Sequence, residues 1–146
     1  MYKRYNECID RDGHITFLEM NKMKKEIIKN SNELTKAKFY TFPQNNSGGR
    51  LVVDEEAGIA ETVIIEAHSA DDANFRAERI GIYFNGVDSD MDCECCGDRW
   101  CETDEGQDVP SYYGTPIENL EPFWYRNRFF IHMLDGSIIK VELDEK

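Results

Sequence analysis

The chain has 146 residues, of which 40% are hydrophobic and 12% aromatic, so it can bury a core as one domain and is not a disordered chain. Its formal net charge of −12 argues against a general nucleic-acid binder, because an acidic surface repels a polyanion. No apolar run approaches the roughly 18 residues that span a membrane, and the N-terminus MYKRYNECIDRDG lacks the apolar core of a secretion signal. We therefore expect a cytosolic protein with reduced thiols.

Residues 1–37 are predicted to form a hairpin and helical arm, separate from an α+β domain over 38–146. Four apolar residues of the arm are spaced three, three and four positions apart, as on one helix face: Phe17, Met20, Met23 and Ile27. The opposite face is rich in lysine. It is either a solvated helix face or a docking surface for an acidic partner, including a second copy of the chain.

The arm also contains CIDRDGHITFLE, which partly matches a calcium-binding loop when Gly13 is its sixth position. Three acids then fall on positions three, five and twelve: Asp10, Asp12 and Glu19. The match fails at position one, where Cys8 replaces an oxygen ligand. A hairpin turn at Asp12–Gly13 explains the same residues and is favoured over calcium.

Two strands are predicted next. Residues 39–42, FYTF, form the first and run into the turn-forming cluster PQNNSGG. Residues 61–67, ETVIIEA, form the second. Three consecutive apolar residues in it, Val63, Ile64 and Ile65, predict burial on both faces, near the centre of a sheet.

A helix is predicted to begin at Ser69 as its N-cap and to stop at Gly81, with Asp71 and Asp72 in the first turn. Its narrow apolar stripe suits close packing on a sheet and consists of Ala70, Ala73, Ala77 and Ile80. Tyr83 and Phe84 are expected to begin a short strand.

Near the C-terminus, RFFIHMLDGSIIKVEL predicts a hairpin, because Asp135–Gly136 supplies positive backbone angles between two β-forming runs. A long aromatic loop, PSYYGTPIENLEPFWYRN, precedes it. The predicted fold class is α+β, with a mainly antiparallel sheet and one helix packed on a face.

The segment DCECCGDRWCE, residues 92–102, contains four of the five cysteines: Cys93, Cys95, Cys96 and Cys101. Cys93, Cys96 and Gly97 fit the C-x-x-C-G pattern of a zinc knuckle, which predicts a structural zinc that staples this loop. Cys101 and Cys95 are candidate further ligands, and Cys8, His14, His68 or His132 can contribute from elsewhere in the fold. Free thiols, a vicinal Cys95–Cys96 disulfide and redox chemistry remain alternatives.

Arg99 and Trp100 lie beside the predicted staple. If the metal fixes the loop so that both side chains face outward, Arg99 can bind a carboxylate or phosphate through two hydrogen bonds, and Trp100 can stack on a base. The favoured alternative places Trp100 in the core and pairs Arg99 with an acid.

The loop QNNSGGR, residues 44–50, is a second candidate binding segment. Its candidate ligand-binding residues form an anion nest with Arg50 as counter-charge: Asn45, Asn46, Ser47, Gly48, Gly49 and Arg50. It lacks the ending of a Walker loop, and a wide hairpin loop is the simpler interpretation.

Blocks such as FYTFPQNNSGG, IGIYFNGV and DCECCGDRW resemble a family of small, uncharacterised proteins of tailed bacteriophages over about residues 39–114. The resemblance implies an accessory protein in the cytoplasm of a host bacterium. The motif residues shared with the family here are Asn45, Asn46, Ser47, Gly48, Gly49, Cys93, Cys95, Cys96, Gly97, Asp98, Arg99 and Trp100. Cys101 and the lysine-rich arm are additions to that pattern.

No catalytic constellation stands out, so we expect no enzyme. The leading hypothesis is an accessory protein that binds, inhibits or redirects a host component, such as an anti-phage defence protein. The alternative is a small-molecule binder that sequesters a nucleotide-type signal through the 45–50 loop, Arg99 and aromatic residues.

Overall fold

The computed structural model describes residues 36–122 and 127–143. The predicted helix, hairpin and calcium loop of the N-terminal arm lie outside these residues, apart from the last two residues of the arm. Within the described part, no helix is long and apolar enough to cross a membrane.

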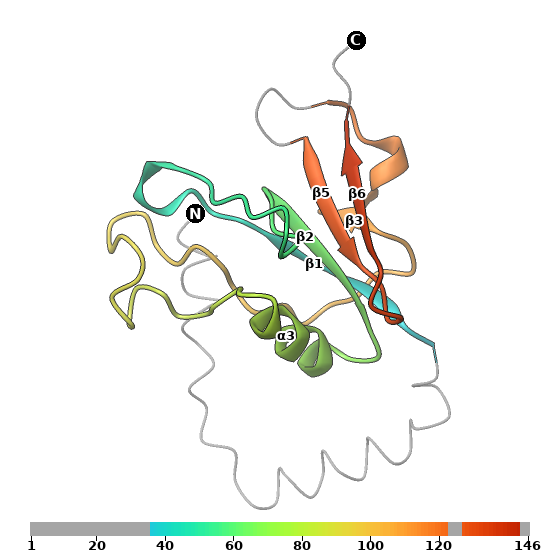
Figure 1. Cartoon of the computed structure of the whole chain (residues 1–146), viewed down its shortest axis with the longest axis horizontal. Helices are drawn as coiled ribbons and strands as arrows, with labels where there is room; N and C mark the ends of the chain where they lie inside the picture. The colour runs from blue at the N-terminus through green and yellow to red at the C-terminus, as the bar shows by residue number, and fades with distance from the viewer. Residues whose placement is uncertain (1–35, 123–126, 144–146) are drawn as a thin grey trace, which may run out of the picture.

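A four-stranded sheet forms the centre of the domain (Figure 1). Its strands, in spatial order, are β1 (Lys38–Pro43), β2 (Thr62–Ala67), β5 (Arg128–His132) and β6 (Ile138–Glu142). The β1–β2 and β5–β6 pairs are antiparallel, whereas β2 and β5 are parallel. The predicted mainly antiparallel sheet is thus confirmed, and one parallel pair is added to it.

Strand β2 lies between β1 and β5, as its consecutive apolar residues predicted. Val63 and Ile65 face helix α3 (Ala70–Arg79), where they pack with Ala73 and Ala77. Alternation along the strand turns Ile64 to the other face. There it joins Ile117, Phe129 and Ile131 in a second core cluster, so the central strand is buried on both sides.

Helix α3 begins and ends where the sequence predicted. The Ser69 side chain caps it by accepting a hydrogen bond from the Asp72 N–H at 3.1 Å. At the other end Gly81 has φ +110°, and the N–H groups of Gly81 and Ile82 donate to Glu78 and Ala77. This Schellman arrangement needs the left-handed backbone that glycine adopts without strain.

The aromatic loop contains a small hairpin, β3 (Ser111–Tyr112) and β4 (Thr115–Pro116), followed by a 3-10 turn η2 (Ile117–Asn119). Tyr113 and Gly114 both have positive φ, as a two-residue hairpin turn requires. Tyr112 and Ile117 pack with Ile64 on the sheet face opposite α3. The Y-G dipeptide was the sequence feature that could have predicted this hairpin.

Two local predictions were wrong. Tyr83 and Phe84 form no strand; Tyr83 instead directs its hydroxyl group toward Asp92. The β5–β6 hairpin is confirmed, but of Asp135 and Gly136 only Gly136 has positive φ. The Met133 carbonyl accepts a hydrogen bond from the Gly136 N–H, and the Met133 N–H donates to the Ser137 carbonyl. These two bonds define a turn that ends in a glycine bulge.

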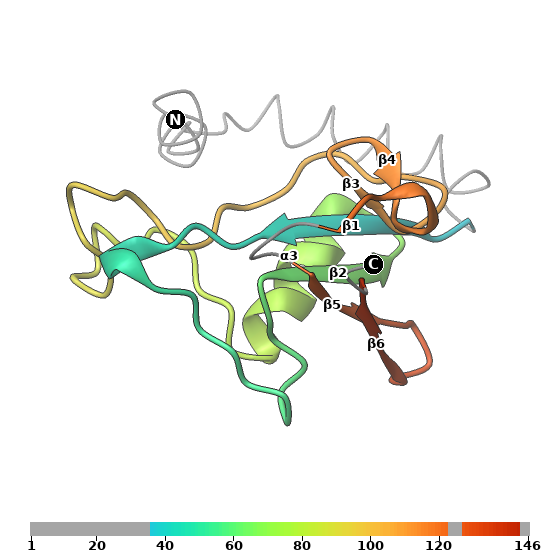
Figure 2. The same ribbon diagram turned by 90° about the horizontal axis from the view of Figure 1, so that it is seen from above.

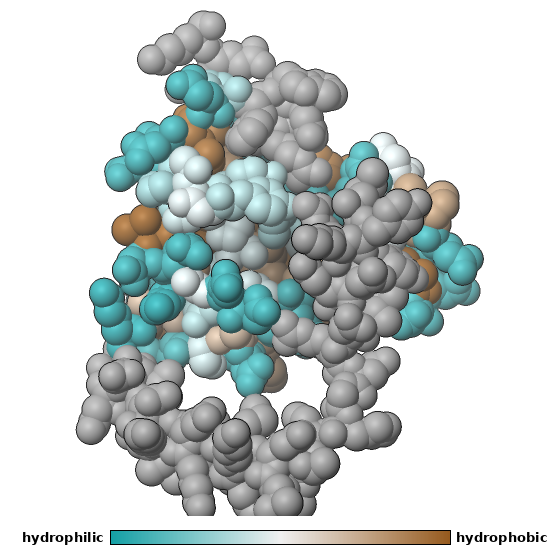
Figure 3. Space-filling model, turned by 180° about the vertical axis from the view of Figure 1, so that it is seen from behind, coloured by the Kyte–Doolittle hydropathy of each residue, from teal (hydrophilic) through white to brown (hydrophobic). Residues whose placement is uncertain are grey.

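Polar residues cover most of the described surface that is visible from behind, with only separate small apolar patches (Figure 3). The scattered exposed hydrophobic residues include Ile138 and Ile139 on β6. Such isolated residues are normal for a protein surface.

We predict that Ile64→Ala lowers the free energy of unfolding by about 2–5 kcal/mol, because the truncation leaves a cavity at a fully buried position. Ile139→Ala is the matched control, since Ile139 is 47% exposed on an edge strand of the same sheet. Urea unfolding followed by circular dichroism measures both. Equal losses for the two variants would contradict the placement of β2 at the centre.

Candidate metal centre

Two loops lie side by side at one end of the sheet (Figures 1 and 2). The polar loop, residues 44–52, follows β1, and the cysteine loop, residues 85–101, follows α3. The hydrogen bonds that join them directly include Asn45 Nδ2 to the Cys96 carbonyl at 2.8 Å, Cys93 N–H to Ser47 Oγ at 2.9 Å, and Asn45 N–H to the Arg99 carbonyl at 2.8 Å. The two sequence blocks therefore form one structural unit.

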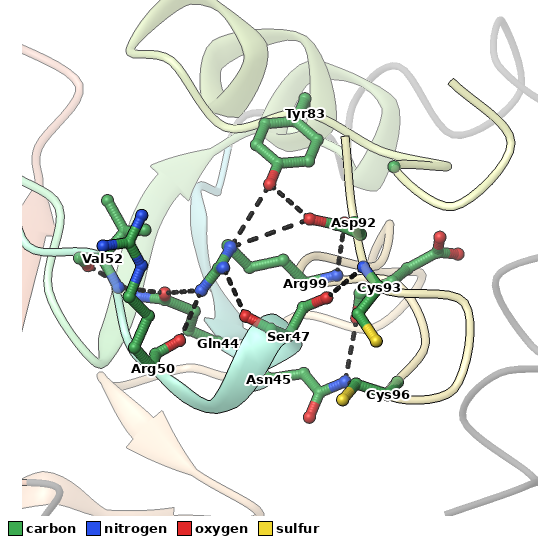
Figure 4. Close-up of polar contacts among 12 residues, drawn as sticks. Gln44, Asn45, Ser47, Arg50, Val52, Tyr83, Asp92, Cys93, Cys96 and Arg99 are labelled. Atoms are coloured by element: carbon green, nitrogen blue, oxygen red, sulfur yellow. Dashed lines mark hydrogen bonds and ion pairs between the residues drawn. The ribbon is translucent and has the colours of Figure 1, made fainter. Parts of the chain in front are cut away.

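Arg99 is the centre of this unit (Figure 4). Its guanidinium donates to Gln44 Oε1 at 2.9 Å and to the backbone carbonyls of Arg50 at 2.8 Å and Ser47 at 2.7 Å. Nε donates to the Tyr83 hydroxyl at 3.3 Å. We call these residues and Asp92 the Arg99 network.

Asp92 supplies the negative charge of the network. Its side chain is fully buried, and Oδ1 lies 3.8 Å from Arg99 Nε. Oδ1 accepts the Tyr83 hydroxyl at 2.6 Å, and Oδ2 accepts the Arg99 N–H at 2.7 Å. Burial, and then the bond to Asp92, raise the pKa of Tyr83, so its hydroxyl stays protonated as a donor.

Gly86 allows Asp92 to take this position. A Cβ atom on Gly86 would lie 1.9 Å from Asp92 Oδ2, a distance that no side chain tolerates. The Gly86 carbonyl also accepts from the N–H groups of Met91 and Asp92. The glycine therefore permits a close backbone approach that folds the cysteine loop back on itself.

Three sulfur atoms gather on the outer side of this unit. The Sγ atoms of Cys93, Cys95 and Cys96 all lie within 4.8 Å of one another, with 2.9 Å between the first two and 3.9 Å between the last two. Cys93 is half-buried, and Cys95 and Cys96 are exposed. The sulfurs of Cys93 and Cys96 lie apart from the Arg99 guanidinium, beyond the Ser47 side chain (Figure 4).

The backbone around these thiols has the turn that the C-x-x-C-G spacing predicted. The N–H groups of Cys96 and Gly97 donate to the Cys93 carbonyl at 3.2 and 2.9 Å, and Gly97 has φ +86°. The turn brings the three side chains to one side within four residues. This is the arrangement that a thiolate metal site requires.

The hydrogen bonds among the thiols separate their pKa values. The hydrogen bond that Cys95 donates, and next the N–H of Cys96, lower the pKa of the Cys93 thiol to about 7. Donating that bond raises the pKa of Cys95 to about 11. Cys93 is therefore the first of these two thiols to ionise, and a bound cation would favour the thiolate form of each.

The sulfur positions fit a metal ion after a small adjustment. A Zn–S bond of about 2.3 Å in a tetrahedron places sulfurs about 3.8 Å apart. The Cys95–Cys96 separation of 3.9 Å already matches, and the Cys93–Cys95 separation of 2.9 Å must widen. Rotation of the exposed Cys95 side chain can provide that change.

The other predicted ligands do not join this group. Among residues 36–122 and 127–143, no further His, Cys, Asp or Glu belongs to it, so the structure does not bring Cys101 or His68 to the three thiols. The His132 ring instead lies 2.8 Å from the Gly58 carbonyl, and burial lowers its pKa. Cys8 and His14 lie outside the described residues.

The expectation that Arg99 and Trp100 face outward is wrong. Arg99 is 8% exposed and Trp100 is 2% exposed, within the core cluster beside α3. The alternative from the sequence, a core tryptophan and an arginine paired with an acid, describes them correctly. What the sequence did not reveal was that Gln44, Tyr83 and Asp92 surround the arginine.

The polar loop serves chiefly as a support for the cysteine loop. Ser47 is buried, whereas Asn46, Gly48, Gly49 and Arg50 are exposed. The N–H groups of Ser47 and Gly49 donate to the carbonyls of Asn45 and Asn46 within the 3-10 turn η1 (Ser47–Gly49). These two donors are therefore directed inside the loop and not toward an anion.

The comparisons with known proteins give one match. A family model described as "Domain of unknown function (DUF7296)" matches residues 37–146. No curated protein and no solved structure is similar enough to the chain to match it.

We predict that Arg99→Ala destabilises the protein by about 3–5 kcal/mol, because it leaves the Asp92 carboxylate buried without its cation. Arg50→Ala is the matched control. Arg50 is exposed and contributes only its carbonyl to the network, which alanine retains. Chemical denaturation of both variants measures the difference, and a loss for Arg99→Ala no larger than that of the control would refute the network.

We also predict that Cys93 is alkylated faster than Cys95 in metal-free, reduced protein. Its rate should rise as the pH passes through about 7, where its thiolate forms, whereas Cys95 stays protonated to a higher pH. Iodoacetamide labelling from pH 6 to 9, followed by peptide mass spectrometry, gives both rates. Cys93→Ser should lower the Cys95 pKa and speed its alkylation; an unchanged Cys95 rate would contradict the coupling.

Proposed function

We propose that this chain, which belongs to the family DUF7296, is a non-enzymatic binding protein whose cysteine loop is held by zinc. The observation that carries the proposal is the approach of three Sγ atoms, from Cys93, Cys95 and Cys96, to within 4.8 Å of one another. Thiolates are preferred ligands of zinc, and the metal would be structural because it fastens a loop that has no helix or strand of its own.

The charge around the metal centre supports a protein as the binding partner. Arg99 is the only basic residue between 85 and 108, and it is buried. The exposed acids of that segment are Asp88, Asp90, Glu94, Asp104, Glu105 and Asp108. This surface attracts a basic protein surface and repels phosphate groups.

The same charges disfavour the alternative of a nucleotide-type ligand. That hypothesis used Arg99 and Trp100 as contacts, and both side chains are occupied inside the protein. Arg50 is the one remaining cation that it invoked. The resemblance to phage accessory proteins adds a context, in which the partner is a component of the host bacterium.

Metal removal tests this function. We predict that protein purified without added metal contains one zinc per chain, and that the Cys93→Ser/Cys95→Ser/Cys96→Ser triple variant contains none. Chelation should lower the thermal midpoint of the wild type and leave that of the triple variant unchanged, because only the wild type loses a stabilising ligand.

Met91→Ser is the matched control, since Met91 is an exposed sulfur-containing residue of the same loop. It should keep the zinc and the chelation response. A pull-down from host lysate with wild type and triple variant then asks whether capture of one host protein depends on the metal. Zinc content well below one per chain in the wild type would reject the proposed centre.

A further inference from the structure

We propose that the metal held by Cys93, Cys95 and Cys96 keeps its fourth coordination position open, and that a neutral imidazole from a partner molecule completes it. This inference rests on the proposed function, because it presupposes the metal. It extends that function by naming the donor chemistry through which a partner would engage the centre.

The first support is the position of the three thiols. They come from four consecutive residues on one turn, and two of the three residues are exposed. A metal bound to them lies at the surface of the described part of the chain, with residues 36–122 and 127–143 on one side only. A site with three protein ligands and an outward-facing fourth position is open to exchange.

The second support is that the neighbouring carboxylates of Asp92 and Asp98 accept hydrogen bonds inside the protein and do not face the thiols. The carboxylates nearest to the thiols along the chain are those of Asp92, Glu94 and Asp98. Both Asp92 oxygens accept hydrogen bonds within the Arg99 network, and Asp98 Oδ1 accepts the Val87 N–H at 2.9 Å. The buried side chains therefore turn inward, and Glu94 does not belong to the thiol group.

The negative charge of the thiolate centre and of the acids around it favours a neutral external ligand over an anionic one. A divalent ion with three thiolates carries a net charge of −1, and exposed Asp88, Asp90 and Glu94 lie on the same loop. A fourth thiolate would add another negative charge to this surface, whereas a neutral imidazole adds none. Three cysteines and one histidine are also an established zinc ligand set.

Cobalt substitution tests the open position. The full chain, reduced and loaded with one Co²⁺, is titrated with free imidazole, with a capped histidine peptide and with 3-mercaptopropionate while the visible spectrum is recorded. We expect imidazole and the histidine peptide each to change the ligand-field bands with one-to-one saturation, and to bind at least about tenfold more tightly than the anionic thiol.

The Asp88→Asn/Asp90→Asn/Glu94→Gln variant separates charge from shape. It should bind Co²⁺ and imidazole, with the preference for imidazole over the thiol reduced several-fold. Cys8→Ser, His14→Ala and Cys101→Ser should each leave the imidazole-free spectrum unchanged.

The outcomes distinguish this inference from the proposed function. Failure to bind Co²⁺ or Zn²⁺ at all rejects the proposed function itself. A metal-loaded protein whose spectrum does not respond to imidazole, or changes with one of those three substitutions, retains the metal centre and overturns the open position. A response to free imidazole without one to the histidine peptide overturns the assignment to a partner's histidine.

Discussion

The buried charge of Arg99 sets the arrangement of the whole candidate site. A guanidinium that leaves water without compensation is costly, so its N–H groups must find acceptors inside the protein. They find acceptors on the polar loop and at Tyr83 after α3, and the Asp92 carboxylate supplies the opposite charge 3.8 Å from Nε. Because one side chain contacts all three, it fixes the positions of these segments relative to one another.

The Arg99 network explains why the polar loop and the cysteine loop form one structural unit. Asn45 and Ser47 bind the backbone of the cysteine turn, and Ser47 also offers its carbonyl to Arg99. The side chains of Asn45 and Ser47, which belonged to the predicted anion site, are used in this contact, and the N–H groups of Ser47 and Gly49 bond within the loop. What remains accessible is the sulfur side of the turn, so the chemistry of the unit is concentrated in three thiols held on a preorganised backbone.

The sequence predicted those features that depend on neighbours along the chain. Alternation, capping and glycine placement located β1, β2, α3 and the β5–β6 hairpin, because each is decided within a few residues. The C-x-x-C-G turn belongs to the same class. The parallel pairing of β2 with β5 does not, since it depends on how a connection of about sixty residues packs on the sheet.

Long-range burial explains the errors at the site. Arginine is exposed in most proteins, and the partners that bury Arg99 lie 7 to 55 residues away along the chain. The sequence pattern of Tyr83 and Phe84 is that of a strand, but Tyr83 was placed by its hydroxyl group and not by its β propensity. Local sequence patterns therefore mispredicted the residues whose positions are set by long-range hydrogen bonds, namely Arg99 and Tyr83.

The three thiols lie so close together that their ionisation states depend on one another. If all three ionise, their charges repel one another within 4.8 Å, and the chain has already separated the pKa values of Cys93 and Cys95 by hydrogen bonding. A divalent cation removes that repulsion and gives every sulfur the same partner. The Arg99 network cannot do this, because its positive charge is buried on the opposite side of the turn and already balanced by Asp92. The fold therefore positions the thiols, but the described residues place no cation in the thiol group; a metal ion from outside would neutralise the charge that the thiols carry when they ionise.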